Sequence, residues 1–166
     1  MTDRSRPGVS ILVVCTGNIC RSPTAEGVLR AVAERRGLAS QVRVASAGTH
    51  DYHVGEAPDP RAVKHASKRG YDLRTLRASQ VEPADFSRHD YILAMDRGHL
   101  RLLKAMAPAN ARAKVVLYLD ESASWKGEDV PDPYYGGPEE FERVLDMVEE
   151  AAERWLDRIE ATSPRS

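Results

Sequence analysis

The chain has 166 residues, of which 42% are hydrophobic and 30% are charged, and its formal net charge at pH 7 is −1. This length predicts one domain over residues 1–166, and the balanced charge argues against nucleic-acid binding. No apolar run is long enough to cross a membrane or to form a secretory signal. The chain has only two cysteines, which fits a reducing compartment. We therefore expect a cytoplasmic protein, and export without a leader peptide is left as an open alternative.

Short apolar runs alternate with amphipathic stretches along the chain. We expect strands over residues 10–14, 41–46, 90–95 and 114–119. We expect helices over residues 23–37, 58–69, 97–106 and 138–160. This alternation predicts an α/β fold, in which helices cover both faces of a four-stranded parallel sheet in a Rossmann-like arrangement. The core is expected over about residues 9–160, with loose tails at 1–8 and 161–166.

The first predicted strand runs into a segment in which Cys15 is followed, after five residues, by Arg21. A thiol attacks only as its thiolate, and a free cysteine has a pKa of about 8.5. Unpaired N–H groups at the start of a helix favour an anion, so we expect them to lower the pKa of Cys15 and to hold a phosphoryl group. Arg21 can pair with two phosphate oxygens at once. The segment therefore predicts a phosphate cradle with a nucleophile at its base.

Other residues of this segment suit the same loop. Gly17 permits a turn with positive φ, and Asn18 is the next best tolerated residue there. Ser22 can donate its hydroxyl to the thiolate and cap the helix, and Pro23 suits the first helical turn. Apart from Cys15 and Arg21 themselves, the predicted phosphate-binding loop consists of Thr16, Gly17, Asn18, Ile19, Cys20 and Ser22.

The two cysteines have other possible interpretations. Cys15 and Cys20 could be small core residues, because free cysteine is often buried. They could also be half of a metal site, but the chain has no third cysteine and its five histidines are dispersed. His50 and His53 form an H-x-x-H pattern without a matching carboxylate pattern. We therefore expect neither a metal nor another cofactor.

The segment Cys-Thr-Gly-Asn-Ile-Cys-Arg-Ser-Pro, residues 15–23, resembles the signature of the low molecular weight protein tyrosine phosphatases. The resemblance covers nearly the whole chain, through the segments at residues 46–49, 58–61, 90–96 and 132–136. It implies a metal-independent protein tyrosine phosphatase with a cysteinyl-phosphate intermediate. The implied partners are phosphotyrosine-containing proteins or peptides, with inorganic phosphate as product, and the implied state is a monomer or weak dimer.

Asp132 lies between Pro131 and Pro133, which restrict the backbone around it. Alone, this segment would be interpreted as a turn. Its continuation into Tyr134 and Tyr135 resembles the acid loop of the family. The resemblance implies that Asp132 protonates the leaving phenol and then activates water, and general acid catalysis typically contributes about 10²–10⁴ in rate.

The resemblance also implies supporting residues. Asn18 would brace the phosphate-binding loop through its side chain. Asp96 would support the loop from the end of the third strand, and it is also a candidate N-cap of the helix that follows. Thr75 stands where some relatives carry a loop-supporting histidine, so we assign it no role.

The substrate walls and Cys20 complete the predicted site. Flat side chains beside a deep cradle suit a phenyl phosphate, whereas phosphoserine is too short to reach the base. In the family, the cysteine equivalent to Cys20 can form a reversible disulfide with the oxidised nucleophile; the alternative is a buried spacer. The candidate walls, for which plain packing is the alternative, are Tyr52, Tyr134 and Tyr135.

Three competing functions share parts of this pattern. Thiol-dependent arsenate reductases need further cysteines, and none follows Cys20. Protein arginine phosphatases tend to place a threonine where this chain has Ile19. A phosphate-binding module without turnover would be expected to lack Cys15 or Asp132. The sequence therefore favours a tyrosine phosphatase, with an arginine phosphatase or a binding module as the alternatives.

Overall fold

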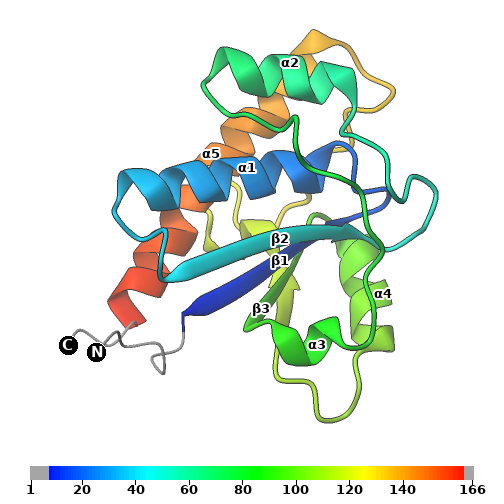
Figure 1. The fold of residues 1–166 in the computed structure, drawn as a ribbon, viewed down its shortest axis with the longest axis vertical. Coiled ribbons are helices and arrows are strands. Elements are labelled where there is room, and N and C mark those ends of the chain that lie inside the picture. Colours follow the sequence, from blue (N-terminus) through cyan, green and yellow to red (C-terminus); the bar gives the residue numbers. More distant parts are fainter. Residues whose placement is uncertain (1–7, 163–166) are drawn as a thin grey trace.

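A computed structural model describes residues 8–162 of the chain. Its sheet consists of four parallel strands in the order β2-β1-β3-β4 (Figure 1). The strands are β1 (Val9–Cys15), β2 (Val42–Gly48), β3 (Tyr91–Ala94) and β4 (Lys114–Leu117). The predicted α/β fold with a four-stranded parallel sheet is confirmed.

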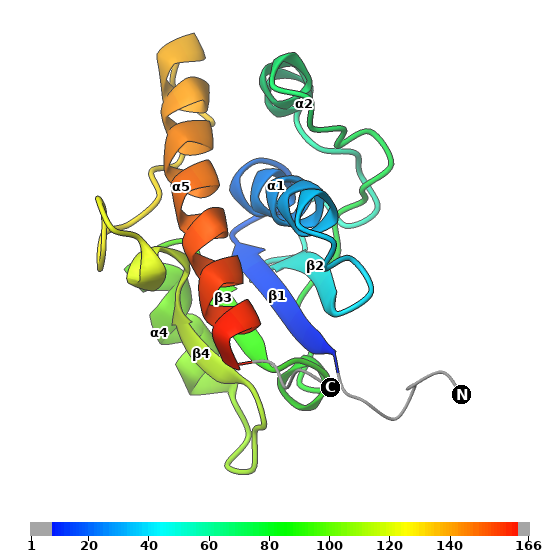
Figure 2. The ribbon, with the colours of Figure 1, turned by 90° about the vertical axis from the view of Figure 1, so that its left-hand side faces the viewer.

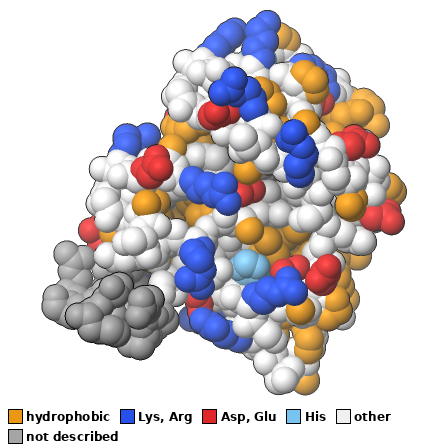
Figure 3. All heavy atoms as spheres, in the orientation of Figure 1, with side chains coloured by type: hydrophobic (Ala, Val, Ile, Leu, Met, Phe, Trp, Pro, Cys, Tyr) orange, Lys and Arg blue, Asp and Glu red, His pale blue; other side chains and the backbone are white. Residues whose placement is uncertain are grey.

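Helices cover both faces of the sheet, as Figures 1 and 2 show. One face carries α1 (Arg21–Arg35) and α5 (Pro138–Thr162), and α2 (Pro60–Lys68) packs outside these two helices, in contact with both. The other face carries α3 (Asp85–Arg88) and α4 (Arg97–Met106). No helix in the described part of the chain has the length and apolar character needed to cross a membrane. On the face shown in Figure 3, acidic and basic side chains are interspersed, in keeping with the balanced net charge.

The alternation of side chains along β1 divides the core between these two layers. Ile11 and Val13 belong to the cluster shared with α1 and α5, whereas Leu12 and Val14 belong to the cluster under α4. All four side chains are at most 3% exposed. Burial of such a side chain contributes about 1.5–3 kcal/mol, so both faces of β1 hold it firmly in place.

Element boundaries differ from the prediction in several places. Helix α1 begins at Arg21 and ends at Arg35, two residues before the predicted stop. Tyr118 and Leu119, predicted as the end of a strand, instead open a 3-10 helix, because the Tyr118 hydroxyl bonds to Val148 O at 2.9 Å. The short α3 was not predicted. Helix α5 continues through residues 161 and 162, where a tail was expected, and the rest of the predicted tails, 1–7 and 163–166, lies outside the described residues.

The strand order places one loop of the molecule at a favourable position for a ligand. The connection leaving β1 leads to β2 on one side, and the connection leaving β3 leads to β4 on the other side, so the two diverge at the carboxyl ends of the adjacent strands β1 and β3. Ligands of open α/β sheets bind at such a switch point. The segment after β3 brings a distant loop to the same edge, because Val130 N–H donates to Met95 O at 2.8 Å.

Candidate active site

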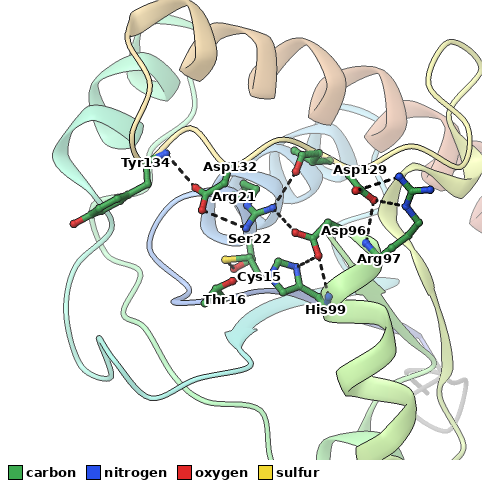
Figure 4. Close-up of polar contacts among 11 residues, drawn as sticks. Cys15, Thr16, Arg21, Ser22, Asp96, Arg97, His99, Asp129, Asp132 and Tyr134 are labelled. Atoms are coloured by element: carbon green, nitrogen blue, oxygen red, sulfur yellow. Dashed lines mark hydrogen bonds and ion pairs between the residues drawn. The ribbon is translucent and has the colours of Figure 1, made fainter.

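The predicted phosphate-binding loop joins the end of β1 to the start of α1. Cys15 is the last residue of β1 and Arg21 the first of α1, and both are at most 4% exposed. Ser22 lies within the first helical turn rather than at its cap, so the predicted capping role is wrong. Its hydroxyl instead lies 2.9 Å from Cys15 Sγ, where it can donate a hydrogen bond to a thiolate (Figure 4).

Asn18 takes the left-handed backbone position of the loop, with φ of +59°. Asn18 was the second candidate for this position after Gly17. Gly17 instead lies close to His53, since a Cβ at Gly17 would be 2.8 Å from His53 Cδ2. Buried Asn18 Nδ2 donates to Ser22 Oγ at 2.8 Å and to Ser46 Oγ at 2.9 Å. Asn18 therefore braces the loop and also fixes the hydroxyl that faces Cys15.

Glu26 forms the buried end of this network. Ser46 Oγ, which accepts from Asn18, donates to Glu26 Oε1 at 2.6 Å. Arg30 Nη2 lies 2.7 Å from the other carboxyl oxygen of Glu26. Burial raises the pKa of Glu26 despite these two contacts. Because the Asn18 amide donates to Ser46 Oγ, the Ser46 hydroxyl can donate its own hydrogen to Glu26.

Arg21 lies at the centre of the site. Its Nη1 donates to Asp96 Oδ2 and to Val130 O, both at 2.9 Å. Its Nη2 lies 3.7 Å from Asp132 Oδ2. Figure 4 shows the guanidinium between these two carboxylates. Arg21 thus links the phosphate-binding loop to the segment that carries Asp132.

Asp96 is the N-cap of α4 and also a hydrogen-bond partner of Arg21. One carboxylate oxygen accepts from Arg21, and the other accepts from His99 N–H at 2.9 Å, which caps α4. Burial opposes the charged form, but hydrogen bonds from His99 and Arg21 and their charges hold the pKa of Asp96 below its usual value. The Asp96 carboxylate is thus available to orient Arg21.

His99 lies beneath the phosphate-binding loop. Its Nε2 is 2.7 Å from Thr16 Oγ1. Its Nδ1 lies 3.1 Å from Asp96 Oδ1, but not in hydrogen-bonding geometry. Burial lowers the pKa of His99 to about 4, against the pull of Asp96. Near neutral pH the imidazole is therefore uncharged.

Asp132 lies at the mouth of the site, with its side chain 50% exposed. Tyr134 N–H donates to Asp132 Oδ1 at 3.1 Å. The second oxygen faces Arg21, and so it faces the phosphate-binding loop (Figure 4). The carboxylate is accessible to a substrate oxygen.

A cavity of about 250 Å³ joins these groups. Cys15, Arg21 and Asp132 line it together with other residues of the phosphate-binding loop. Its remaining lining includes His53 and all three predicted wall residues, Tyr52, Tyr134 and Tyr135. Tyr52 is 65% exposed and Tyr135 is 94% exposed, which argues against the packing alternative for these two.

Cys20 faces the same cavity but in a different environment. Both cysteines are free thiols, and Cys20 is 6% exposed. Burial, then the nearby charge of Asp59, raises the pKa of Cys20 far above its usual value. Cys20 therefore remains protonated near neutral pH, which excludes it as the attacking thiolate.

Several residues of the site were not singled out in the sequence. Glu26 lies in the second turn of α1 and His99 in the first turn of α4, and the structure brings both close to the loop. Ser79 N–H donates to Asn18 Oδ1 at 2.9 Å, and Ser79 follows Thr75 by four residues in the sequence. Only Glu26 carried a sequence signal, because a carboxyl on the apolar side of a predicted helix needs a buried partner.

Known proteins resemble this chain along most of its length. The family model "low molecular weight phosphotyrosine protein phosphatase" matches residues 10–165. A low molecular weight protein-tyrosine-phosphatase of Streptomyces coelicolor is 45% identical over 145 residues, which cover 86% of this chain and 88% of the relative. The crystal structure of a protein tyrosine phosphatase from Entamoeba histolytica has a TM-score of 0.89 and 38% identity, over 93% of this chain and 98% of the other. An arginine phosphatase from Drosophila has a TM-score of 0.84 and 30% identity, over 89% of this chain and 96% of the other.

Proposed function

This chain belongs to the low molecular weight phosphotyrosine protein phosphatase family, and we propose that it hydrolyses phosphotyrosine through a cysteinyl-phosphate on Cys15. The observation that carries the proposal is the convergence of Cys15, Arg21 and Asp132 on one cavity with aromatic walls. A nucleophile, a cation for the phosphate and a carboxyl group for proton transfer are the groups that such a reaction needs.

In the first step, the Cys15 thiolate attacks phosphorus in line with the leaving phenol oxygen. The sulfur–phosphorus bond forms as the phosphorus–oxygen bond breaks. Arg21 and the N–H groups of the loop hold the three remaining oxygens, whose charge shifts in the transition state. Protonated Asp132 gives its proton to the phenol oxygen, so that the product leaves as neutral tyrosine.

In the second step, a water molecule takes the place of the phenol. Asp132, now a carboxylate, accepts a proton from this water as the oxygen attacks phosphorus. The sulfur–phosphorus bond breaks, inorganic phosphate leaves, and the Cys15 thiolate is restored. The Ser22 hydroxyl, 2.9 Å from the sulfur, stabilises that thiolate as the leaving group.

The cavity walls favour an aromatic phosphate on a protein or peptide. Tyr52 and Tyr134 provide flat surfaces beside the cradle, and the exposed Tyr135 can contact a peptide chain. Ile19 also lines the cavity, where the arginine phosphatases tend to have a threonine. An apolar side chain there suits a phenyl ring better than a guanidinium group.

Cys20 is proposed as the partner of an oxidised Cys15. Oxidation of Cys15 to a sulfenic acid by a peroxide would let the Cys20 thiol displace water and form a disulfide. Because burial keeps Cys20 protonated, this thiol loses its proton only as the new bond forms.

The test is phosphate release from a phosphotyrosine peptide, without added metal, by the wild type and by Cys15→Ser. Release by the wild type alone supports the proposal. Release by the wild type and by Cys15→Ser at the same rate contradicts the proposal. Silence from both directs the assay to phosphoarginine, where release would establish the arginine phosphatase alternative, and further silence would favour a binding module.

A further inference from the structure

The segment Pro58–Arg61 at the start of α2 has no role in the proposed chemistry, yet it lies between the two loops of the site. Asp59 N–H donates to Ile19 O at 2.8 Å, which attaches this segment to the phosphate-binding loop. Asp59 caps α2 through its side chain and is 8% exposed. Its position is therefore fixed relative to Cys15 and Arg21.

Arg61 is held by Asp59 in a fork-to-fork pair. Arg61 Nε and Nη2 lie 3.1 and 2.9 Å from the two oxygens of the Asp59 carboxylate, and Arg61 N–H donates to the first of them at 2.8 Å. Burial opposes the charge on Asp59, but these hydrogen bonds hold its pKa below the usual value. The pair leaves the guanidinium plane little freedom to rotate.

The same guanidinium contacts the loop that carries the proposed general acid. Arg61 Nη2 donates to Tyr134 O at 2.9 Å. The guanidinium carbon also lies 5.4 Å from the ring centre of Tyr134 and 4.8 Å from that of Phe141, both within the range of a cation–π contact. Arg61 thus fixes both the backbone and the side chain of Tyr134.

Tyr134 transmits this constraint to Asp132. Its N–H donates to Asp132 Oδ1, while its carbonyl accepts from Arg61. The other side of the loop is held at Val130, whose N–H donates to Met95 O and whose carbonyl accepts from Arg21. The two prolines beside Asp132 stiffen the backbone between these two attachment points.

We propose that Arg61 is a positioning residue that, paired with Asp59, sets the distance between Asp132 and the phosphate held by Cys15 and Arg21. The inference rests on the proposed function, since it assumes that Asp132 transfers the proton. Without Arg61, the Tyr134 end of the loop loses its attachment to the phosphate-binding loop. Asp132 then spends less time within hydrogen-bond reach of the leaving oxygen.

The test compares kcat/KM over a series of aryl phosphates whose phenols differ in pKa. A good leaving group departs without a proton, whereas phenol itself needs one. Arg61→Ala is expected to lower kcat/KM on phenyl phosphate by about 10-fold, because displacement by the order of 1 Å can cost up to about 100-fold. The loss should shrink toward zero for nitrophenyl phosphates. A plot of log kcat/KM against the pKa of the phenol should therefore be steeper for Arg61→Ala than for the wild type, as is also expected for Asp132→Ala.

The chain contains a matched control. Asp72 and Arg74 repeat the same pair, with Arg74 N–H, Nε and Nη2 at 3.0, 2.9 and 2.9 Å from the Asp72 carboxylate. The Arg74 side chain is 77% exposed and does not line the active-site cavity. Arg74→Ala removes the same kind of ion pair, and its plot is expected to coincide with that of the wild type.

A second variant separates positioning from charge. Arg61→Lys keeps the positive charge but cannot pair with Asp59 and reach Tyr134 O in one plane, so its slope should lie between those of the wild type and Arg61→Ala. If both Arg61 variants fold and their slopes of log kcat/KM against phenol pKa equal that of the wild type, the inference is overturned. A loss of kcat/KM that is the same for every substrate would also overturn it. Failure of the proposed function is distinguishable, because it would appear as phosphate release by Cys15→Ser or as no release by the wild type.

Discussion

The buried imidazole of His99 should make the stability of this protein depend on pH. Its side chain is 6% exposed, between Thr16 and Asp96. Burial lowers its pKa from 6.5 to about 4. Between these values the unfolded chain binds a proton that the folded chain does not, so the free energy of unfolding rises with pH across this window. The stability that comes from keeping His99 uncharged is complete above pH 6.5 and is lost as the pH falls toward 4.

The size of the effect follows from the shift. The difference between 6.5 and about 4 is 2.5 pKa units, and one unit corresponds to about 1.36 kcal/mol, so the total is about 3 kcal/mol. This is a large share of the stability of a typical domain, which is about 5–15 kcal/mol. The pKa of Asp96 is lowered in the folded protein. Protonation of its carboxylate at still lower pH therefore decreases the free energy of unfolding further.

Urea unfolding of the wild type and of His99→Gln, at about pH 7 and about pH 4.5, tests this reasoning. Glutamine does not titrate, and its amide can reach Thr16. The wild type should lose about 2 kcal/mol more than the variant between the two conditions. Equal losses in the two proteins would refute the account, because they would show that His99 has the same pKa in the folded and unfolded states.

Three further substitutions test the rest of the site. Asp132→Ala should slow hydrolysis of phenyl phosphate by roughly 10²–10⁴-fold with little change in KM; steady-state kinetics equal to those of the wild type would contradict its role as acid. Asn18→Ala removes a hydrogen-bond partner from two serine hydroxyls and one backbone N–H. It should therefore lower the free energy of unfolding by about 2 kcal/mol, measured by urea unfolding, and lower kcat/KM, measured by steady-state kinetics. In Gly48→Ala the new Cβ would lie 2.6 Å from Thr16 O, so unfolding should become easier by about 1–3 kcal/mol, and a variant as stable as the wild type would show that the loop moves freely.

The fold could be predicted from the sequence because its determinants are local. Each strand is short and consists mostly of apolar residues, and the boundaries of α4 agree with the prediction at both ends. The errors occur where a distant contact decides the local conformation. Tyr118 has the composition of a strand, but its hydroxyl and its carbonyl bond to Val148 and Trp155 of α5, and the chain turns there.

The site could be predicted where its residues share one short segment, and less well where they do not. The loop from Cys15 to Ser22 is a single motif, although the left-handed position falls on Asn18 rather than Gly17. Contacts across more than 70 residues, such as that of His99 with Thr16 or Arg61 with Tyr134, leave no local pattern. They depend on the order of strands in the sheet, which sets what meets at the carboxyl end of β1.

In the proposed mechanism, phosphate passes through the Cys15 sulfur. To detect the intermediate, the reaction with an aryl phosphate is quenched in acid during turnover, the protein is digested, and the phosphoryl group is located by mass spectrometry. We expect one phosphoryl group on Cys15, none on Cys20, and none in the Cys15→Ser variant. A phosphoryl group on another residue, or turnover by Cys15→Ser, would show that the phosphate takes another route.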